Sequence, residues 1–218
     1  MTEAPAARVV ASKLTHRYGR RATGVCDLDF EFASPGAVAV TGPNGCGKST
    51  LLRIVAGLLR PSSGTSTVQV GGRDHGPADR RHVLGLASPE LSFYEEFTAE
   101  ENLVFAAEAH GLGSPVRAAA AALDRVGLGT RAADRVASFS SGMKQRLRLA
   151  FALLHEPAIL LLDEPGSHLD ESGREAVRDV VARHAARGLV LLATNDPEEI
   201  QLVERHLELH GHGLGDPA

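Results

Sequence analysis

The sequence predicts an α/β fold with a parallel sheet, and three observations lead to this prediction. Residues 37–41 form a short apolar run that enters a glycine-rich loop and is followed by helical spacing. Residues 159–163 and 189–193 are continuous apolar runs of strand length, as in parallel strands buried on both faces. Residues 98–155 have helical patterns only. We therefore expect one domain over residues 1–218, with β-rich ends flanking a helical insert.

The amino-terminal part is predicted to contain mostly strands. Apolar residues at helical spacing predict one helix at residues 49–59, which Pro61, the two following serines and Gly64 end. The strands are expected at residues 9–14, 26–32, 37–41, 68–70 and 83–87.

Capping patterns predict where the later helices begin. Thr98 and Glu101 form a capping-box pattern for a helix that reaches about residue 110. Ser114 and Pro115 supply an N-cap and a first-turn proline for an alanine-rich helix. Asp196, followed by a proline, repeats this pattern near the end of the chain. The helices are expected at residues 98–110, 115–126, 141–154 and 171–186.

Composition excludes several classes of protein. The 218 residues carry a formal net charge of −4, and basic residues are scattered, so nucleic acid is not an expected partner. The pair Arg80 and Arg81 is interpreted as solvated surface. The two cysteines lack the spacing of a metal site or a disulfide scaffold. No apolar run approaches the ~20 residues of a membrane helix and the start has no signal-peptide pattern, so a cytoplasmic protein is expected.

Residues 42–49 match a phosphate-binding loop at every fixed position, between a predicted strand and a predicted helix. Its glycines allow backbone N–H groups to converge on phosphate oxygens at a helix N-terminus. Lys48 can reach the β- and γ-phosphates and the Ser49 hydroxyl can ligate magnesium, whereas Cys46 is interpreted as a spacer. The predicted nucleotide-binding residues of this loop are Gly42, Pro43, Asn44, Gly45, Cys46, Gly47, Lys48, Ser49 and Thr50.

Two carboxylates follow the buried strand at residues 159–163 and complete the phosphate site. Asp163 is predicted to hold the magnesium shell, as the acidic strand end does in P-loop enzymes. Glu164 is predicted to orient or deprotonate the attacking water. A polar strand end without function is the alternative, and the phosphate loop upstream favours the catalytic interpretation.

Residues 140–146, Ser-Ser-Gly-Met-Lys-Gln-Arg, lie just upstream of the acidic strand. With the phosphate loop and Asp163-Glu164 in this order, the chain resembles the ATP-binding subunits of ABC transporters from about residue 8 to 209. Residues 140–146 match the signature loop of that family, and residues 167–170 match its D-loop. Tyr18 matches the aromatic residue that stacks on adenine; a tyrosine without that role is the alternative.

The resemblance implies a P-loop NTPase core with an N-terminal antiparallel β subdomain and a helical subdomain at about residues 98–155. It implies ATP and Mg²⁺ as ligands and a head-to-tail homodimer, with a heterodimer as the alternative. Ser140, Ser141 and Gly142 of one subunit would then cover the ATP on the other. The helical subdomain would grip a transmembrane permease subunit, which would place the chain on the inner face of the cell membrane.

Three differences from the common family pattern bear on function. Phe139, Ser141 and Met143 replace Leu, Gly and Gln, and such variants resemble exporters of the heme (cytochrome c maturation), polysaccharide and drug groups. The family's glutamine before the insert is missing, and alignment puts Pro89 there with Glu90 next. Glu90 could take over the role of this glutamine at magnesium or as a relay. The alternative, which is favoured, is that Glu90 is an exposed loop carboxylate.

Asn195 occupies the position of the family's switch histidine. Asparagine can donate a neutral hydrogen bond to a γ-phosphate, about half as strong as a charge-assisted one, so slow hydrolysis is predicted. Lys48, Glu164 and Asn195 are therefore the expected catalytic residues. The histidines downstream of Glu164 are interpreted as surface residues: His168, His184, His206, His210 and His212.

The expected function is ATP hydrolysis that drives a transporter, and an exporter is favoured. Three alternatives remain open: a soluble ATPase of the same family that acts in cluster assembly or a similar process, an ATP-gated dimerisation module that seldom hydrolyses, and a P-loop kinase. The kinase leaves the signature and D-loop resemblances unexplained. Neither the cargo nor the membrane partner follows from the sequence.

Overall fold

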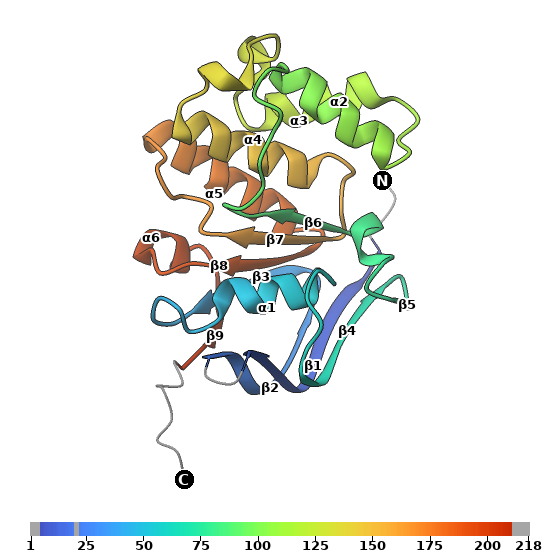
Figure 1. The fold of residues 1–218 in the computed structure, drawn as a ribbon, viewed down its shortest axis with the longest axis vertical. Coiled ribbons are helices and arrows are strands. Elements are labelled where there is room, and N and C mark those ends of the chain that lie inside the picture. Colours follow the sequence, from blue (N-terminus) through green and yellow to red (C-terminus); the bar gives the residue numbers. More distant parts are fainter. Residues whose placement is uncertain (1–4, 20–21, 211–218) are drawn as a thin grey trace.

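The computed structural model describes residues 5–19 and 22–210, which form two sheets (Figure 1). A five-stranded parallel sheet has the order β6-β7-β8-β3-β9, and a four-stranded antiparallel sheet has the order β2-β1-β4-β5. The parallel strands are β3 (Gly36–Thr41), β6 (Leu84–Ala87), β7 (Ile159–Asp163), β8 (Leu189–Ala193) and β9 (Arg205–Glu208). The antiparallel strands are β1 (Ala7–Tyr18), β2 (Ala22–Ala33), β4 (Ser63–Val70) and β5 (Arg73–His75).

The parallel sheet is buried on both faces, as the continuous apolar runs predict. All five residues of β7 and all five of β8 are buried. Alternate side chains of β7 enter different cores: Leu160 and Leu162 pack with the helices on one face, whereas Ile159 and Leu161 pack toward the antiparallel sheet. A strand flanked by two cores must be apolar throughout, because neither face meets water.

Helices cover the two faces of the parallel sheet unequally (Figure 1). Helix α1 (Lys48–Val55) contacts strands of both sheets, so it lies between them. Helices α4 (Ser141–Leu153) and α5 (Glu171–Ala185) pack on the other face, and α2 (Ala99–Ala109) and α3 (Pro115–Arg125) pack against α4. The short helix α6 (Pro197–Ile200) follows β8, and 3₁₀ turns lie at Arg80–His82, Gly129–Arg131 and Val136–Ser138.

The capping box is confirmed at α2 and the expected cap is absent at α3. Glu101 N donates to Thr98 Oγ1 over 3.0 Å, and Thr98 N donates to Glu101 Oε2 over 2.8 Å. Ser114 occupies the N-cap position of α3 but its side chain makes no capping hydrogen bond, so that part of the prediction is wrong. The backbone of Ser114 has φ −143° and ψ 71°, whereas the capping residue Thr98 has ψ 165°.

Two further differences concern α1. The helix ends at Val55 rather than residue 59, and Leu58 is 70% exposed. Arg80, expected on the surface, is 4% exposed, and its guanidinium donates to the carbonyls of Ile54 (3.0 Å) and Val55 (3.1 Å). Arg80 therefore binds the last carbonyls of α1, which lack partners within the helix. Burial lowers the pKa of this guanidinium.

The carboxyl ends of β7, β8 and β3 meet at one edge of the parallel sheet. Ala193 of β8 is paired with Asp163 of β7 on one side and with Val40 of β3 on the other. The loop after Thr41, the carboxylate Glu164 and the segment containing Asn195 therefore leave the sheet at the same level. In open parallel sheets this edge is where ligands bind.

Candidate nucleotide-binding site

The phosphate loop connects β3 to α1, in the strand-loop-helix context that the sequence predicts. Gly42, Gly45 and Gly47 have φ values of 136°, 80° and 109°, which favour glycine. A Cβ at Gly47 would lie 1.5 Å from the carbonyl oxygen of Gly24 in β2, so no side chain fits there. This close approach brings the antiparallel sheet against the start of α1.

Lys48 is the first residue of α1 and is only 6% exposed. Its Nζ donates to the carbonyl of Gly42 over 2.8 Å and approaches that of Pro43 at 3.4 Å. The ammonium group therefore lies across the loop whose amides would face the phosphates. Cys46 is 7% exposed and belongs to the core between the sheets, which agrees with its interpretation as a spacer.

Ser49 and Asp163 are adjacent although they lie far apart in the sequence. Ser49 Oγ donates to Asp163 Oδ1 over 3.1 Å, and Asp163 is 4% exposed. Burial raises the pKa of the Asp163 carboxyl; the bond from Ser49 opposes the rise and Glu164 adds to it. A hydroxyl beside a buried carboxylate fits a magnesium ion, which proteins bind with one or two carboxylates and substrate phosphates.

Glu164 directly follows β7 and its backbone has the left-handed φ of 48°. Its amide donates to the carbonyl of Ala193 over 2.9 Å, while the side chain is exposed and lines the pocket at the phosphate loop. Left-handed backbone costs an ordinary residue of the order of 1 kcal/mol and persists only where the surroundings impose it. The structure thus directs this carboxylate toward the place where phosphates would bind.

Asn195 contacts the phosphate loop at two points. Its Oδ1 accepts from the amide of Gly42 at 3.3 Å, and its Nδ2 donates to Asn44 Oδ1 over 3.0 Å. The preceding residue, Thr194, is buried, and its amide donates to the carbonyl of Val40. The position of Asn195 beside the loop agrees with the predicted switch role, which itself stays a prediction.

A pocket of about 360 Å³ is lined by half of the predicted site residues. Tyr18 is 45% exposed at its wall, and its hydroxyl is hydrogen-bonded to that of Thr50 (3.0 Å). The ring is therefore partly accessible at this pocket, and its stacking role toward adenine stays a prediction. The pocket is lined by Tyr18, Gly24, Asn44, Gly45, Gly47, Lys48, Ser49, Thr50 and Glu164.

The signature and D-loop residues do not line this pocket within one chain. Ser140 is the N-cap of α4, where its Oγ accepts from Met143 N at 3.2 Å, and Ser141 is exposed beside it. A Cβ at Gly142 would lie 3.1 Å from the carbonyl oxygen of His168 in the D-loop, so these two loops are neighbours. Asp170 caps α5 by accepting from Gly173 N over 2.9 Å, and this bond holds its pKa down.

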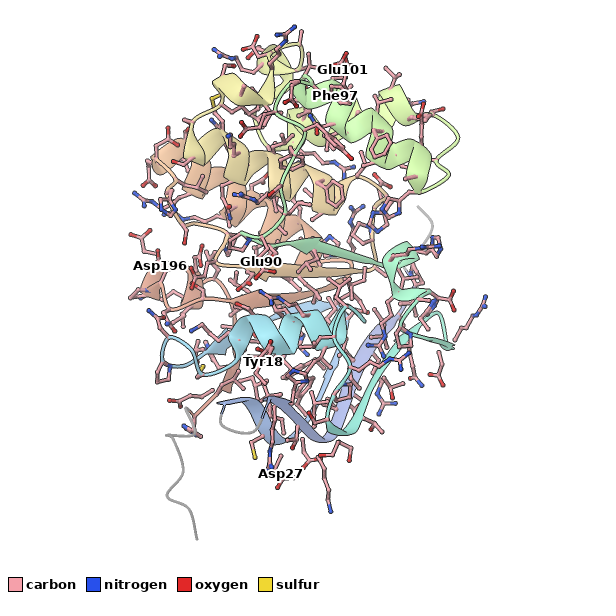
Figure 2. All side chains as sticks on the ribbon, viewed as in Figure 1. Tyr18, Asp27, Glu90, Phe97, Glu101 and Asp196 are labelled. Carbon is pink, nitrogen blue, oxygen red and sulfur yellow. The ribbon has the colours of Figure 1, made fainter. Side chains whose placement is uncertain are left out.

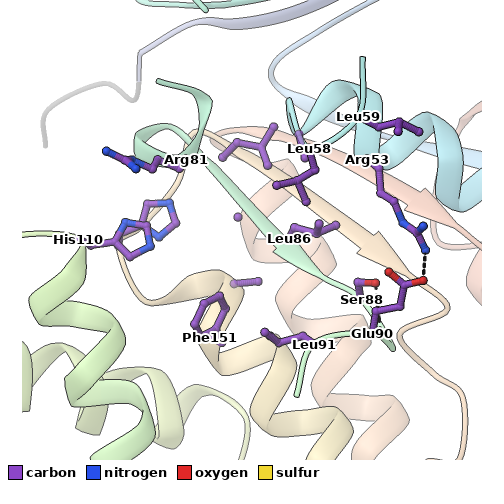
Figure 3. A pocket seen from close by; sticks show the side chains of 15 residues that line it. Arg53, Leu58, Leu59, Arg81, Leu86, Ser88, Glu90, Leu91, His110 and Phe151 are labelled. Carbon is purple, nitrogen blue, oxygen red and sulfur yellow. Dashed lines mark hydrogen bonds and ion pairs between the residues drawn. The ribbon is translucent and has the colours of Figure 1, made fainter. Parts of the chain in front are cut away.

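Glu90 is mostly exposed, as favoured from the sequence, and it is paired with Arg53 of α1. Figure 3 shows this pair at the rim of a second pocket, of about 580 Å³, whose other walls are mainly apolar. The Glu90 charge adds slightly to the raised pKa of Asp163, so the two carboxylates are near one another. Figure 2 places Glu90 above α1, on the side of the parallel sheet.

Two buried polar residues near the site were not identified from the sequence. Gln145, in the signature helix, donates from Nε2 to the carbonyls of Glu164 and Pro165, each over 3.2 Å. Glu199, in α6, is 7% exposed. In the sequence each resembles an ordinary helical polar residue, and no local signal separates Glu199 from its exposed neighbour Glu198.

One interpretation of the histidines is wrong. His168, His206 and His210 are exposed, as expected, but His184 in α5 is 3% exposed. His212 lies outside the described residues. None of the helices in the described ranges 5–19 and 22–210 has the length and apolar character to span a bilayer.

A parallel-sheet α/β core with a phosphate loop, an adjacent Ser–Asp pair and a following glutamate defines a P-loop nucleotide-binding protein. The family model described as ABC transporter matches residues 25–167, about two thirds of the chain. The chain belongs to the ABC transporter family and is an ATP-binding subunit of that family.

Curated relatives point to different transport systems. The chain is 33% identical over 198 residues to the linearmycin resistance ATP-binding protein LnrL of Bacillus subtilis, covering 88% of this chain and 63% of that one. It is 41% identical over 174 residues to the cytochrome c biogenesis ATP-binding export protein CcmA of Rhodopseudomonas palustris, covering 78% and 83%. It is 38% identical over 205 residues to the aliphatic sulfonates import ATP-binding protein SsuB of Burkholderia thailandensis, covering 92% and 58%. The chain thus spans about three fifths of the length of several of these relatives.

The fold matches solved ATP-binding cassettes. The dimeric structure of a post-hydrolysis state of the cassette MJ0796, bound to ADP and Pi, aligns with a TM-score of 0.83, 21% identity, and coverage of 94% of this chain and 97% of that one. This likeness confirms the predicted fold class: a P-loop core with an antiparallel sheet and a helical insert. The extent of the domain over residues 1–218 remains a prediction.

Proposed function

We propose that this protein hydrolyses magnesium-ATP and thereby drives a transmembrane subunit, as the motor of an exporter. The observation that carries the proposal is the meeting of Lys48, Asp163 and Glu164 at one edge of the parallel sheet. Lys48 and Glu164 line one pocket there, and Asp163 accepts from Ser49, which lines the same pocket. A bound magnesium ion would be held by Ser49 and Asp163 and would supply charge neutralisation at the phosphates.

Different residues of the site have different proposed roles toward ATP. Loop amides and Lys48 would hold the phosphates, and Tyr18 would offer its ring to the base. The exposed carboxylate of Glu164 would orient and deprotonate the attacking water, a role that contributes about 10²–10⁴ in rate. Asn195 would donate from Nδ2 toward the γ-phosphate, for which it must leave its present partner, Asn44.

Dimerisation is part of the proposal because the signature residues Ser140, Ser141 and Gly142 lie away from the pocket of their own chain. A second copy arranged head to tail would bring the N-terminus of its α4 over the γ-phosphate, where a helix N-terminus favours negative charge. The MJ0796 cassette was solved as a dimer bound to ADP and Pi, which supports the proposal of dimerisation.

The proposed docking site for the transmembrane subunit is the apolar pocket beside Arg53 and Glu90 (Figure 3). Leu86 and Phe151 line it and Leu58, 70% exposed, stands at its edge. An apolar groove of this size suits a helix that lays its apolar face into it. Arg53 and Glu90 line this groove, and their charges also act on the pKa of Asp163. The groove is therefore proposed to couple the transmembrane subunit to the nucleotide site.

The experiment that tests the proposed activity is steady-state magnesium-ATP hydrolysis by the purified chain. We expect turnover that Lys48→Ala abolishes by removing ATP binding. Glu164→Gln should retain ATP binding and lose at least about 10²-fold in turnover, since it lacks a base. Wild-type protein that binds ATP without hydrolysing it would instead support the ATP-gated dimerisation module.

The direction of transport is proposed from CcmA, whose name includes export and of which the chain covers 83%. The likeness to SsuB, an import protein, supports the opposite direction over 58% of that protein. With its transmembrane subunit reconstituted in inverted vesicles, an exporter should accumulate its substrate when ATP is added outside. ATP-dependent loss of preloaded substrate would identify an importer.

A further inference from the structure

Glu199 is a buried acidic residue that the proposed hydrolysis leaves without a role. It is 7% exposed, and its Oε1 atom has no hydrogen-bond partner among the described residues. Its neighbour Glu198 is exposed and binds Arg178 (Nη2–Oε2 2.7 Å). Burying a carboxyl group with an unpartnered oxygen costs free energy, so it is retained only where something offsets the cost.

The Glu199 carboxyl group is packed against the turn that follows Glu164. A Cβ at Gly166 would lie 2.3 Å from Glu199 Oε1, so any side chain at position 166 would displace this carboxyl from its present place. Burial raises the pKa of Glu199, and Asp196 and Glu164 act in the same direction, while the Thr194 hydroxyl and the Gly166 amide oppose the rise. Glu199 therefore lies between the turn 164–166 and the segment that leads to Asn195.

The same turn is also held by the signature helix. Gln145, itself 6% exposed, donates to the carbonyls of Glu164 and Pro165. The turn 164–166 is thus in contact with the buried side chain of Gln145 from α4 and with that of Glu199 from α6. These contacts explain how Glu164 keeps its left-handed φ of 48°, because such a conformation persists only where packing over-determines it.

We propose that Glu199 is a positioning residue for ATP hydrolysis: its buried carboxyl group fixes the turn 164–166 against Thr194, and so fixes the carboxylate of Glu164 relative to Asn195 and the phosphate loop. This inference rests on the proposed function. A displacement of about 1 Å in a catalytic group can cost about 10²-fold in rate, so the contact has a measurable consequence.

The test compares Glu199→Ala with Glu199→Gln and with the control Glu198→Ala from the same helical turn. We expect Glu199→Ala to lower kcat about tenfold or more with the KM for ATP changed less than about twofold, because the phosphate loop is untouched. Glu199→Gln preserves the shape of the side chain and should retain at least about half of the wild-type kcat. An unchanged kcat in Glu199→Ala, or an equal loss in Glu198→Ala, would overturn the role.

A second variant tests the contact itself and needs no buried volume to be removed. Gly166→Ala should lower kcat without changing the KM for ATP, because the new methyl group displaces the Glu199 carboxyl. In the Glu199→Ala background the same change should have no further effect, since residues in contact are non-additive. If the kcat losses of the two single variants multiply in the double variant, the contact is contradicted. Normal turnover in Gly166→Ala would also contradict it, even if Glu199→Ala failed to fold.

The outcomes separate this role from the function on which it rests. Absence of wild-type hydrolysis would overturn both the proposed function and the role of Glu199. Wild-type hydrolysis that Glu164→Gln abolishes and Glu199→Ala leaves intact would overturn the role of Glu199 alone.

Discussion

Asn195 is the residue that we expect to limit the rate of ATP hydrolysis without preventing it. It lies between the backbone amide of Gly42 and the side chain of Asn44, so it already uses its carbonyl and amide groups on the phosphate loop. An asparagine can donate to a γ-phosphate only as a neutral group. A protonated histidine at the same place would form a charge-assisted bond, which is about twice as strong.

At this scale we predict that Asn195→His raises the steady-state rate of ATP hydrolysis. An increase of about tenfold corresponds to about 1.4 kcal/mol of transition-state stabilisation, within the range of a hydrogen bond that gains charge. The measurement is kcat at saturating magnesium-ATP, with Asn195→Ala as the matched variant that loses both hydrogen bonds. A histidine variant that is no faster than wild type would mean that asparagine is not the limiting feature.

At the scale of single elements, two helix ends are stabilised in different ways and a third lacks the expected cap. Thr98 and Glu101 cap α2 through side chains from the same turn, and the bond to the Thr98 backbone holds the pKa of Glu101 down. The end of α1 is bound by Arg80, which comes from a distant 3₁₀ turn. The start of α3 has a serine in the right place without the hydrogen bond. Only the first of these follows from local sequence.

We predict that Thr98→Ala destabilises the protein by about 1 kcal/mol, the usual cost of losing an N-cap. Ser114→Ala is the matched control, and it should change stability by only a few tenths of a kcal/mol because its hydroxyl caps nothing. Urea denaturation of both variants checks this. An equal loss in the two variants would contradict the capping assignment.

At the scale of the whole molecule, we expect two histidines with lowered pKa values, the half-buried His155 and the buried His184, to make stability depend on pH. His155 and His184 have both ring nitrogens without a partner among the described residues. Burial lowers the pKa of each to about 4, and nearby groups assist: His110 for His155, Arg187 for His184. His155 is stacked on His110 with ring centroids 4.4 Å apart, beside the apolar pocket (Figure 3).

These shifts determine the sign of the pH dependence. In the unfolded chain a histidine has a pKa of about 6.5, so between about pH 6.5 and 4 the unfolded state binds more protons and stability falls as pH falls. We predict a loss of about 2 kcal/mol per histidine between about pH 7 and pH 5. His184→Leu should remove one of these contributions, whereas the exposed His206→Leu should leave the pH dependence of urea unfolding as in wild type. A His184→Leu protein with the wild-type slope would contradict the assignment.

Much of the nucleotide site was predictable from local sequence. The phosphate loop, its following helix and the strand that ends at Asp163 are encoded by contiguous residues, because glycine conformation and strand burial are local requirements. The assignment of Asn195 to the position of the switch histidine came instead from the family resemblance, and its role stays a prediction. The bounds of β7 and β8 agree with the predicted ranges because continuous apolar runs have clear ends.

By itself, the sequence therefore predicted the fold class and the family, which are confirmed, and it named phosphate-site residues whose roles stay predictions. The tertiary structure alone decided the strand order, in which β8 separates β7 from β3 and so places Asn195 between the loop and Glu164. It also decided that Glu199 rather than Glu198 is buried, and that Arg80 binds the end of α1. Strand order and burial depend on contacts between segments that are distant in the sequence, and the residue type at one position does not reveal those contacts.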